Sequence, residues 1–263
     1  MTKTLAISQL SGHLASRRQS PASAEAVVRS FDTWAYKREK PSSPGLMQHS
    51  VARAIASTEP IPFVLYWGKG PRQMLAGPDN QCLDYLASMG ERIASVYAPG
   101  ASFTLILTDT HARLNEHTET NIQSYYQAIA RAAFARGFQH VHLSDVVKAY
   151  VPPSDQSCIE SVPSDVLERL THSAMKWYGG DDTPNSAALQ YFEINMQEKR
   201  AVEQCFPGAI FLTFNSSQYR LLFPEKLPIF YMYSIKKGTA VKPWFIAEAA
   251  DGQNSVETIG THK

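Results

Sequence analysis

Residues 61–72 read IPFVLYWGKGPR, an apolar run that stops at a glycine and is followed by two cations. The run has apolar side chains at both odd and even positions, which is typical of a strand that is buried on both faces. The glycines on either side of Lys69 allow a sharp turn and a close approach of the backbone to a ligand. This stretch therefore predicts a central strand that ends in a loop suited to binding.

Four more strand candidates follow this one along the chain, and helical segments separate them. The strand candidates are residues 102–109, 138–146, 208–215 and 227–235. The helical segments are residues 80–97, 119–137, 163–178 and 185–206. Apolar strands that alternate with helices of a dozen or more residues indicate a parallel sheet covered on both sides. We expect an α/β fold of Rossmann-like type, with a largely parallel central sheet and helices on both faces.

The first part of the chain has a different pattern. Residues 23–39 have apolar side chains at helical spacing, residues 40–45 have the Pro, Ser and Gly content of a linker, and residues 46–57 predict a second short helix. We therefore expect an N-terminal helical extension over residues 1–58. An α/β catalytic domain should cover residues 59–263.

Composition excludes several classes of protein. The formal net charge of the 263 residues is +1, which argues against nucleic acid as a partner. No apolar run approaches the roughly 20 residues that span a bilayer, so no membrane association is predicted. The N-terminus lacks the apolar core of a secretory signal, and Cys82, Cys158 and Cys205 have no metal or redox spacing. We expect a cytoplasmic protein with structural thiols.

Charged side chains follow the first two strands of the predicted sheet. Lys69 comes just after the first strand and Asp109 closes the second. In open α/β sheets the ligand sits beyond the carboxyl ends of the strands, so we expect these two side chains to meet at one edge. The alternative reading of Lys69 and Arg72 is a polar, solvated turn.

A cluster of titratable residues follows the second strand. Asp109, His111, Arg113, Glu116 and His117 lie within residues 107–117, but their spacing does not match a metal site. The sequence also contains no Walker A loop, no G-x-G-x-x-G and no G-x-S-x-G motif. We therefore predict neither a metal nor an organic cofactor.

Ordered short motifs over residues 60–246 resemble the pyoverdine/dityrosine biosynthesis family, whose best-understood members are isonitrile synthases. The matching residues are Lys69, Gly77-Pro78-Asp79, Tyr97, Pro99-Gly100-Ala101, Thr108-Asp109, Met196, Glu198, Phe206-Pro207, Ala209-Ile210 and Pro243-Trp244. The resemblance implies an enzyme that joins the amine of an amino acid to the ketone carbon of ribulose 5-phosphate. It also implies that a pathway oxygenase, dependent on iron and 2-oxoglutarate, can act on the product.

The reaction that the resemblance implies suggests roles for the candidate catalytic residues, and for His111, Arg72 and Arg113 these roles rest only on their proximity in the sequence. Lys69 is expected to act as acid or base, Asp109 to orient it or to hold the substrate ammonium, and His111 to shuttle a proton. The expected substrate-binding residues are Arg72, Arg113, Glu198, Phe211, Asn215 and Trp244. Among these, Arg72 or Arg113 would contact the phosphate.

Departures from the family pattern leave more than one function open. Phe211 stands where the family has Arg, and Asn215 stands where it has His. We expect Phe211 to make that side of the pocket more apolar, which favours a less charged co-substrate. The first hypothesis is therefore an isonitrile synthase-like enzyme acting on an amino acid or related amine. The second is a divergent lyase or transferase of the same fold that makes no isonitrile, and the third is a non-catalytic small-molecule-binding protein.

Overall fold

The computed structural model describes residues 22–68, 75, 77–114, 117–151, 162–178, 181–215, 217, 222–223 and 226–232. The helices are α1 (Ala24–Phe31), α2 (Pro44–Ser57), α3 (Gly77–Ala94), α4 (Asp109–Leu114), α5 (Glu119–Phe134), α6 (Leu143–Tyr150), α7 (Ser164–Trp177) and α8 (Pro184–Cys205). The strands are β1 (Ile61–Trp67), β2 (Ala101–Leu107), β3 (Gln139–His142), β4 (Ile210–Thr213) and β5 (Ile229–Tyr231).

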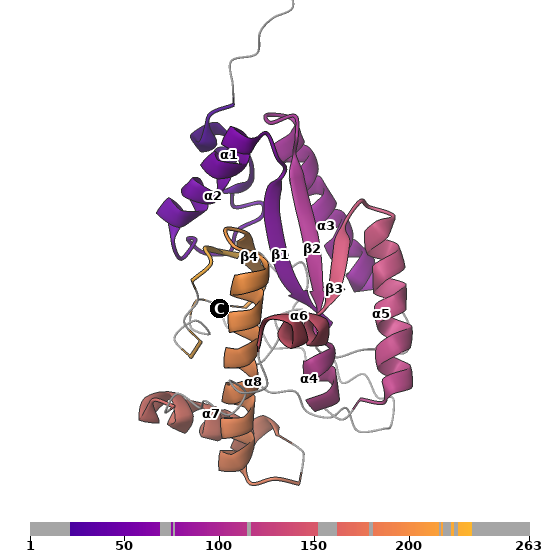
Figure 1. Ribbon diagram of the computed structural model, residues 1–263, viewed down its shortest axis with the longest axis vertical. Helices are drawn as coiled ribbons and strands as arrows, with labels where there is room; N and C mark the ends of the chain where they lie inside the picture. Colours follow the sequence, from indigo (N-terminus) through magenta and orange to yellow (C-terminus); the bar gives the residue numbers. More distant parts are fainter. Residues whose placement is uncertain are drawn as a thin grey trace, which may run out of the picture.

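The strands form one five-stranded sheet in the order β3-β2-β1-β4-β5, and every pairing is parallel. This confirms the expected α/β fold, and Figure 1 shows β1, β2 and β3 running to a common lower end. The register aligns the carboxyl ends of three strands, because Trp67 pairs with Leu107 and Leu107 pairs with His142. The residues that follow these strands are therefore neighbours, as expected for the loops of an open parallel sheet.

Helices cover both faces of the sheet, as the sequence predicted. On one face, Phe63 and Leu65 of β1 share a core with side chains of α1, α2, α3 and α5. On the other face, Val64 and Ile106 share a core with side chains of α6 and α8. The alternation of facing along β1 explains why the strand is apolar at both odd and even positions. A third apolar cluster joins α7 to the N-terminal half of α8.

The two N-terminal helices pack on the sheet itself. Phe31 of α1 lies edge-on to Phe63 of β1, with ring centroids 5.3 Å apart, and also contacts Phe230 of β5. The segment after α1 runs beside β5, where Lys37 forms an antiparallel bridge to Met232 and Ser42 N donates to Ile229 O. This segment covers the outer edge of β5, which would otherwise present unpaired backbone groups. The division into an extension of residues 1–58 and a domain of residues 59–263 stays a prediction.

Two strands end earlier than the sequence predicted and are followed at once by a helix. The strand predicted over 138–146 is only Gln139–His142, and α6 begins at Leu143. The strand predicted over 102–109 ends at Leu107, and Asp109 opens α4, a helix that the sequence did not reveal. In both places a turn into a helix directly follows the strand, so the apolar run that was assigned to the strand continues into a buried helical turn.

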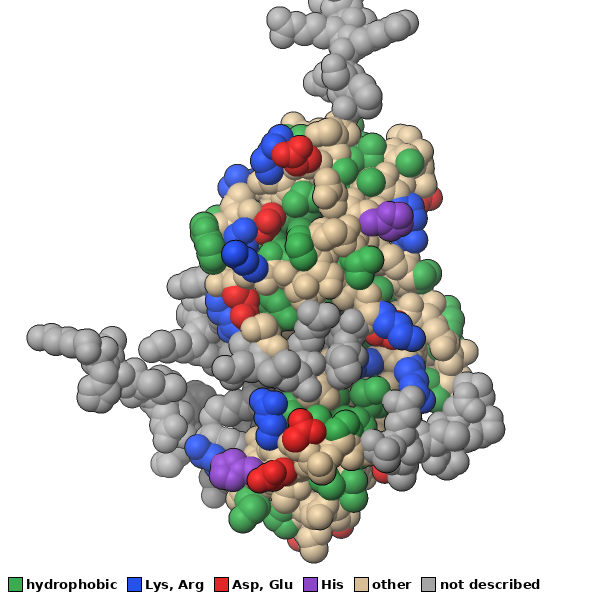
Figure 2. All heavy atoms as spheres, turned by 90° about the vertical axis from the view of Figure 1, so that its left-hand side faces the viewer, with side chains coloured by type: hydrophobic (Ala, Val, Ile, Leu, Met, Phe, Trp, Pro, Cys, Tyr) green, Lys and Arg blue, Asp and Glu red, His purple; other side chains and the backbone are tan. Residues whose placement is uncertain are grey.

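Charged side chains of both signs are mixed on one face of the described surface. Figure 2 shows that, among the described side chains of the face it presents, cations and carboxylates are interspersed and no field of one sign gathers. Within the described residues, none of the helices combines the length and the apolar character that a membrane span requires.

Candidate functional site

The carboxyl ends of β1 and β2 are locked together by Thr108. Its backbone N–H and its hydroxyl both donate to Trp67 O, at 2.9 and 3.0 Å. Gly68, the next residue after β1, has a φ of 81° and accepts a 2.6 Å hydrogen bond from the Tyr126 hydroxyl. The glycine in the opening stretch therefore serves a turn that a side chain would disturb. Lys69 and Arg72 lie outside the described residues.

Asp109 is the buried carboxylate at the end of β2. Its Oδ1 accepts from Ser144 N at 3.0 Å, and its Oδ2 accepts from Ser144 Oγ at 2.5 Å and from Arg113 Nη1 at 2.8 Å. His142 Nδ1 lies 4.0 Å from the same Oδ2. The carboxylate therefore ties the ends of β2 and β3 together and has its charge met by a cation.

The surroundings of Asp109 favour its ionised form. Burial alone would raise the pKa of this carboxyl, but the hydrogen bonds from Ser144 and the ion pair with Arg113 outweigh burial and bring the pKa below its ordinary value. Arg113 is itself shared, because its Nε donates to Glu119 Oε1 at 2.5 Å. The guanidinium that the sequence offered for phosphate is thus engaged by two carboxylates.

His111 and Glu198 form a second buried pair, from α4 and α8. His111 Nε2 lies 2.5 Å from Glu198 Oε2, and both side chains are almost fully buried, at 0% and 2% exposure. The other oxygen, Glu198 Oε1, accepts a hydrogen bond from the Thr110 hydroxyl. Tyr191 lies edge-on to the imidazole, with ring centroids 5.9 Å apart. A carboxylate that orients an imidazole in this way is the arrangement that enzymes use for proton transfer.

Local structure explains why these groups converge. α4 starts at the end of β2, so Asp109, Thr110 and His111 emerge together at the carboxyl edge of the sheet. α8 is 22 residues long and presents Tyr191, Asn195 and Glu198 among its buried side chains. Because residues three or four apart share a helix face, these polar groups lie on the face that turns toward the sheet.

The other predicted substrate-binding residues lie in different surroundings. Phe211 pairs with Val64 within the sheet and belongs to the apolar core on the α8 side, where it packs edge-on against Tyr66. The hollow that it lines is only about 10 Å³, roughly the space of one water. Asn215 follows β4 and its backbone N–H donates to Thr213 Oγ1 at 3.1 Å. Trp244 lies outside the described residues.

The structure therefore brings four of the predicted residues together in two pairs. Asp109 and Arg113 form an ion pair, and His111 and Glu198 form a hydrogen-bonded pair two residues farther along α4. Sequence analysis did not single out Ser144, Thr110 or Tyr126 as members of the site. Glu198 was named through the family resemblance, and in the structure this buried carboxylate of α8 has the partners that burial requires.

Donor groups for a metal do not gather in the described part of the chain. Within those residues there is no group of three or more His, Cys, Asp and Glu side chains that could hold a metal ion. Cys82 and Cys205 are free thiols, and burial raises the pKa of Cys82 to about 12.

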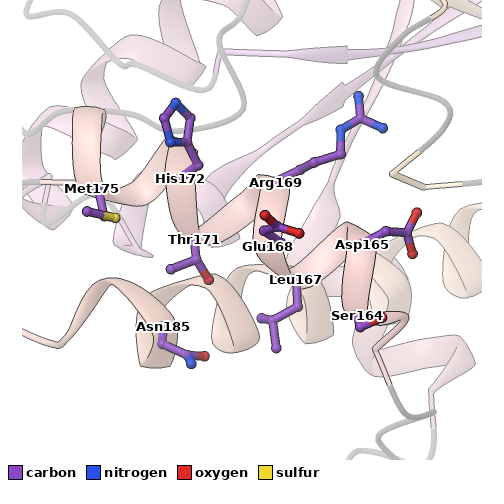
Figure 3. A pocket seen from close by; sticks show the side chains of 9 residues that line it. All are labelled: Ser164, Asp165, Leu167, Glu168, Arg169, Thr171, His172, Met175 and Asn185. Carbon is purple, nitrogen blue, oxygen red and sulfur yellow. The ribbon is translucent and has the colours of Figure 1, made fainter.

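A wider hollow than the one beside Phe211 lies elsewhere, along α7. It measures about 930 Å³ and runs past Asp165, Glu168, Arg169 and His172, with Asn185 of α8 at one side (Figure 3). The residues point to different sides of α7 and most are exposed, and charges of both signs alternate. The hollow is a groove on the outside of a helix, without the convergent polar groups of a reaction centre.

Of the comparisons with known proteins, only the one with solved structures finds a match. No family model matches the sequence, and no curated protein matches it either. Among solved structures, the crystal structure of the PvcA protein from Pseudomonas aeruginosa is similar, with a TM-score of 0.55 and 17% sequence identity. The match covers 85% of this chain and 87% of that chain. At this identity, the likeness shows that the two proteins share a fold over most of their lengths.

Proposed function

We propose that this protein is a small-molecule biosynthetic enzyme whose reaction centre lies at the carboxyl edge of the sheet. The observation that carries this proposal is the buried His111–Glu198 pair, with Thr110 holding the far oxygen of the carboxylate. Burying an imidazole and a carboxylate costs free energy, so a pair retained at the ligand-binding edge of a parallel sheet favours a catalytic role. The fold likeness to PvcA and the ordered motifs support the same family of enzymes.

In this proposal, His111 moves a proton and Glu198 positions it. The reaction that the resemblance implies is the attack of an amino acid's amine on the ketone carbon of ribulose 5-phosphate. The ammonium must first lose a proton, and the carbinolamine must then lose its hydroxyl as water, so the site needs a base and an acid. Asp109 would hold the substrate near Lys69, the second acid or base in the proposal.

A second candidate function is a lyase or transferase of the same fold that does not use a sugar phosphate. The observation that favours it is the state of Arg113, which is engaged by Asp109 and Glu119. Phe211 adds to it, because this side chain lies in an apolar core. A non-catalytic small-molecule-binding protein is the third reading, and the buried His111–Glu198 pair argues against it.

The experiment is an incubation of purified protein with the pooled proteinogenic amino acids, with and without ribulose 5-phosphate, followed by mass spectrometry. A product with an isonitrile mass that depends on the sugar phosphate would support the first function. Loss of an amino acid without such a product would support the second. If no amino acid were consumed, only the third hypothesis, a non-catalytic small-molecule-binding protein, would remain.

The remaining expectations stay predictions. A cytoplasmic location, a small-molecule partner and a downstream oxygenase of the same pathway accompany the proposed function.

Replacing Arg72 and Arg113 separately tests whether either residue binds the phosphate. An unchanged affinity for sugar phosphates in both variants would rule out this role. Phe211→Arg tests whether position 211 lines the pocket. Unchanged product formation by this variant with every substrate would show that it does not.

A further inference from the structure

One nitrogen of the buried imidazole of His111 has no hydrogen-bond partner among the described residues. His111 Nδ1 is inaccessible to solvent and makes no hydrogen bond with any of the described residues. A buried polar atom without a partner costs about 1–3 kcal/mol, and native proteins leave few atoms in this state. An atom of this kind in a reaction centre is completed by a ligand or by an ordered water.

The contact on the other nitrogen fixes what Nδ1 can do. Glu198 Oε2 lies 2.5 Å from Nε2, and Glu198 Oε1 already accepts from Thr110. A carboxylate oxygen at this distance requires a donor, so the proton of the neutral imidazole resides on Nε2. Nδ1 then carries the lone pair and can only accept a hydrogen bond.

The charges on this short helix select the kind of donor. α4 carries Asp109 at its first residue, and the cation Arg113 is shared between Asp109 and the nearby Glu119. With Glu198, three described carboxylates on and beside α4 stand against two cations, Arg113 and the buried Lys199 that follows Glu198 on α8, so negative charge is in excess. Such a setting attracts a cation and repels phosphate or carboxylate.

From these observations, we infer that His111 Nδ1 is the acceptor for the ammonium group of an amine substrate. The inference rests on the proposed function for the chemical step, though not for binding. In that step, an N–H bond of the ammonium breaks and its proton moves to Nδ1. The electron pair stays on the substrate nitrogen, which can then attack a carbonyl carbon. Glu198 stabilises the imidazolium that forms, as a carboxylate does in hydrolase triads.

Nitrogen-15 NMR of histidine-labelled protein tests the inference without turnover. The probes are ethylammonium chloride, tetramethylammonium chloride, sodium acetate and inorganic phosphate. Tetramethylammonium is the matched control, since it carries the same charge but has no N–H to donate. We expect an unprotonated Nδ1 and a protonated Nε2 in the free protein. We also expect a saturable shift of Nδ1 with ethylammonium and none with the other three probes.

Any other response to the four probes overturns the inference. A protonated Nδ1 in the free protein would show the opposite tautomer of His111, with no lone pair on Nδ1 to accept a hydrogen bond. A response to both cations would show that the site binds positive charge without accepting an N–H. A response to acetate or phosphate would make it an anion site, and no response to any probe would mean a structural water only. Saturable ethylammonium binding in a protein that consumes no amino acid would keep the inference and remove the proposed enzyme.

Two variants separate the two nitrogens. His111→Asn keeps an acceptor near the place of Nδ1, whereas His111→Gln keeps a group near the place of Nε2 only. We expect His111→Gln to bind ethylammonium about tenfold to hundredfold more weakly than the wild type, and His111→Asn to lose much less. Equal losses in the two variants, with both folded by circular dichroism, would contradict the assignment to Nδ1.

Discussion

A single buried carboxylate, Asp109, joins three parts of the site. It accepts hydrogen bonds from Ser144 at the start of α6 and from Arg113 one turn along α4, and it lies two residues before His111. Because its ionised form has these partners in the folded state only, its protonation is linked to folding.

Asp109→Asn is therefore expected to lower stability in a pH-dependent way. The pKa of Asp109 is lower in the folded state, so its stabilising effect is complete above its unfolded value of about 4 and is lost as the pH falls through the folded value. The variant should lose roughly 1–3 kcal/mol at about pH 7 and less at about pH 3. Urea unfolding of both proteins at the two pH values measures the difference.

Asp84→Asn is the control for this measurement, because Asp84 is an exposed carboxylate that pairs with Arg136 on the surface. It removes the same charge and should change the stability by less than about 1 kcal/mol. A loss for Asp109→Asn that is the same at both pH values would show that packing, and not charge, is what the asparagine disturbs.

Thr110 offers a test of the His111–Glu198 pair at the residue scale. Thr110→Val keeps the shape of the side chain but removes the hydroxyl that donates to Glu198. We expect kcat to fall by about tenfold and its pH profile to shift, because Glu198 would no longer be held against His111. Thr110→Ser should restore both. A fall in kcat with an unchanged pH profile would indicate a merely structural hydroxyl.

At the scale of elements, the sequence predicted the strands better than the turns that follow them. Residues 61–67 matched β1 in full, because an apolar strand that ends at a glycine has both a pattern and a stop signal. α4 was missed because its six residues, Asp109–Leu114, are too few to show a helical period. Glu198 was named only through the family resemblance, and the contact with His111 joins residues 87 positions apart, which no local pattern records.

The turn after β1 can be tested with a glycine pair. Gly68 has a positive φ, and a Cβ at this position would lie 2.5 Å from the Tyr126 ring. Gly68→Ala should therefore destabilise the protein by about 1–3 kcal/mol and displace the tyrosine. Gly45→Ala in α2 is the control, since nothing lies within 4 Å of its Cβ and alanine favours a helix. Thermal melts of both variants measure the loss of stability. Equal losses of stability in the two variants would refute the account of Gly68.

At the scale of the whole molecule, the N-terminal helices and the sheet share one core. The sequence suggested an extension, because residues 40–45 have the composition of a linker, but composition does not show where the helices on either side pack. Val27, Phe31, Met47 and Val51 all lie in the same apolar cluster as β1. The helices therefore contribute to the stability of the sheet that carries the site.

Phe31→Ala is expected to destabilise the whole protein. The side chain is fully buried against Phe63 and Phe230, so the variant should lose roughly 3–5 kcal/mol in a single unfolding transition. Phe134→Ala removes the same group from a side chain that is 79% exposed and should change stability by less than about 0.5 kcal/mol. If α1 melted separately while the sheet stayed folded, the shared core would not be cooperative.

The central claim is that the buried His111–Glu198 pair carries out the reaction. Product formation by Glu198→Gln tests it most directly, because this change removes the negative charge of the carboxylate and keeps the shape of the side chain. Glu193→Gln, on the same helix but not buried, is the matched control. In the pooled amino acid assay, the wild type and Glu193→Gln should form product at the same rate. Glu198→Gln should form it at least about a hundredfold more slowly while keeping the wild-type circular dichroism spectrum. A folded Glu198→Gln that works as fast as the wild type would contradict the account.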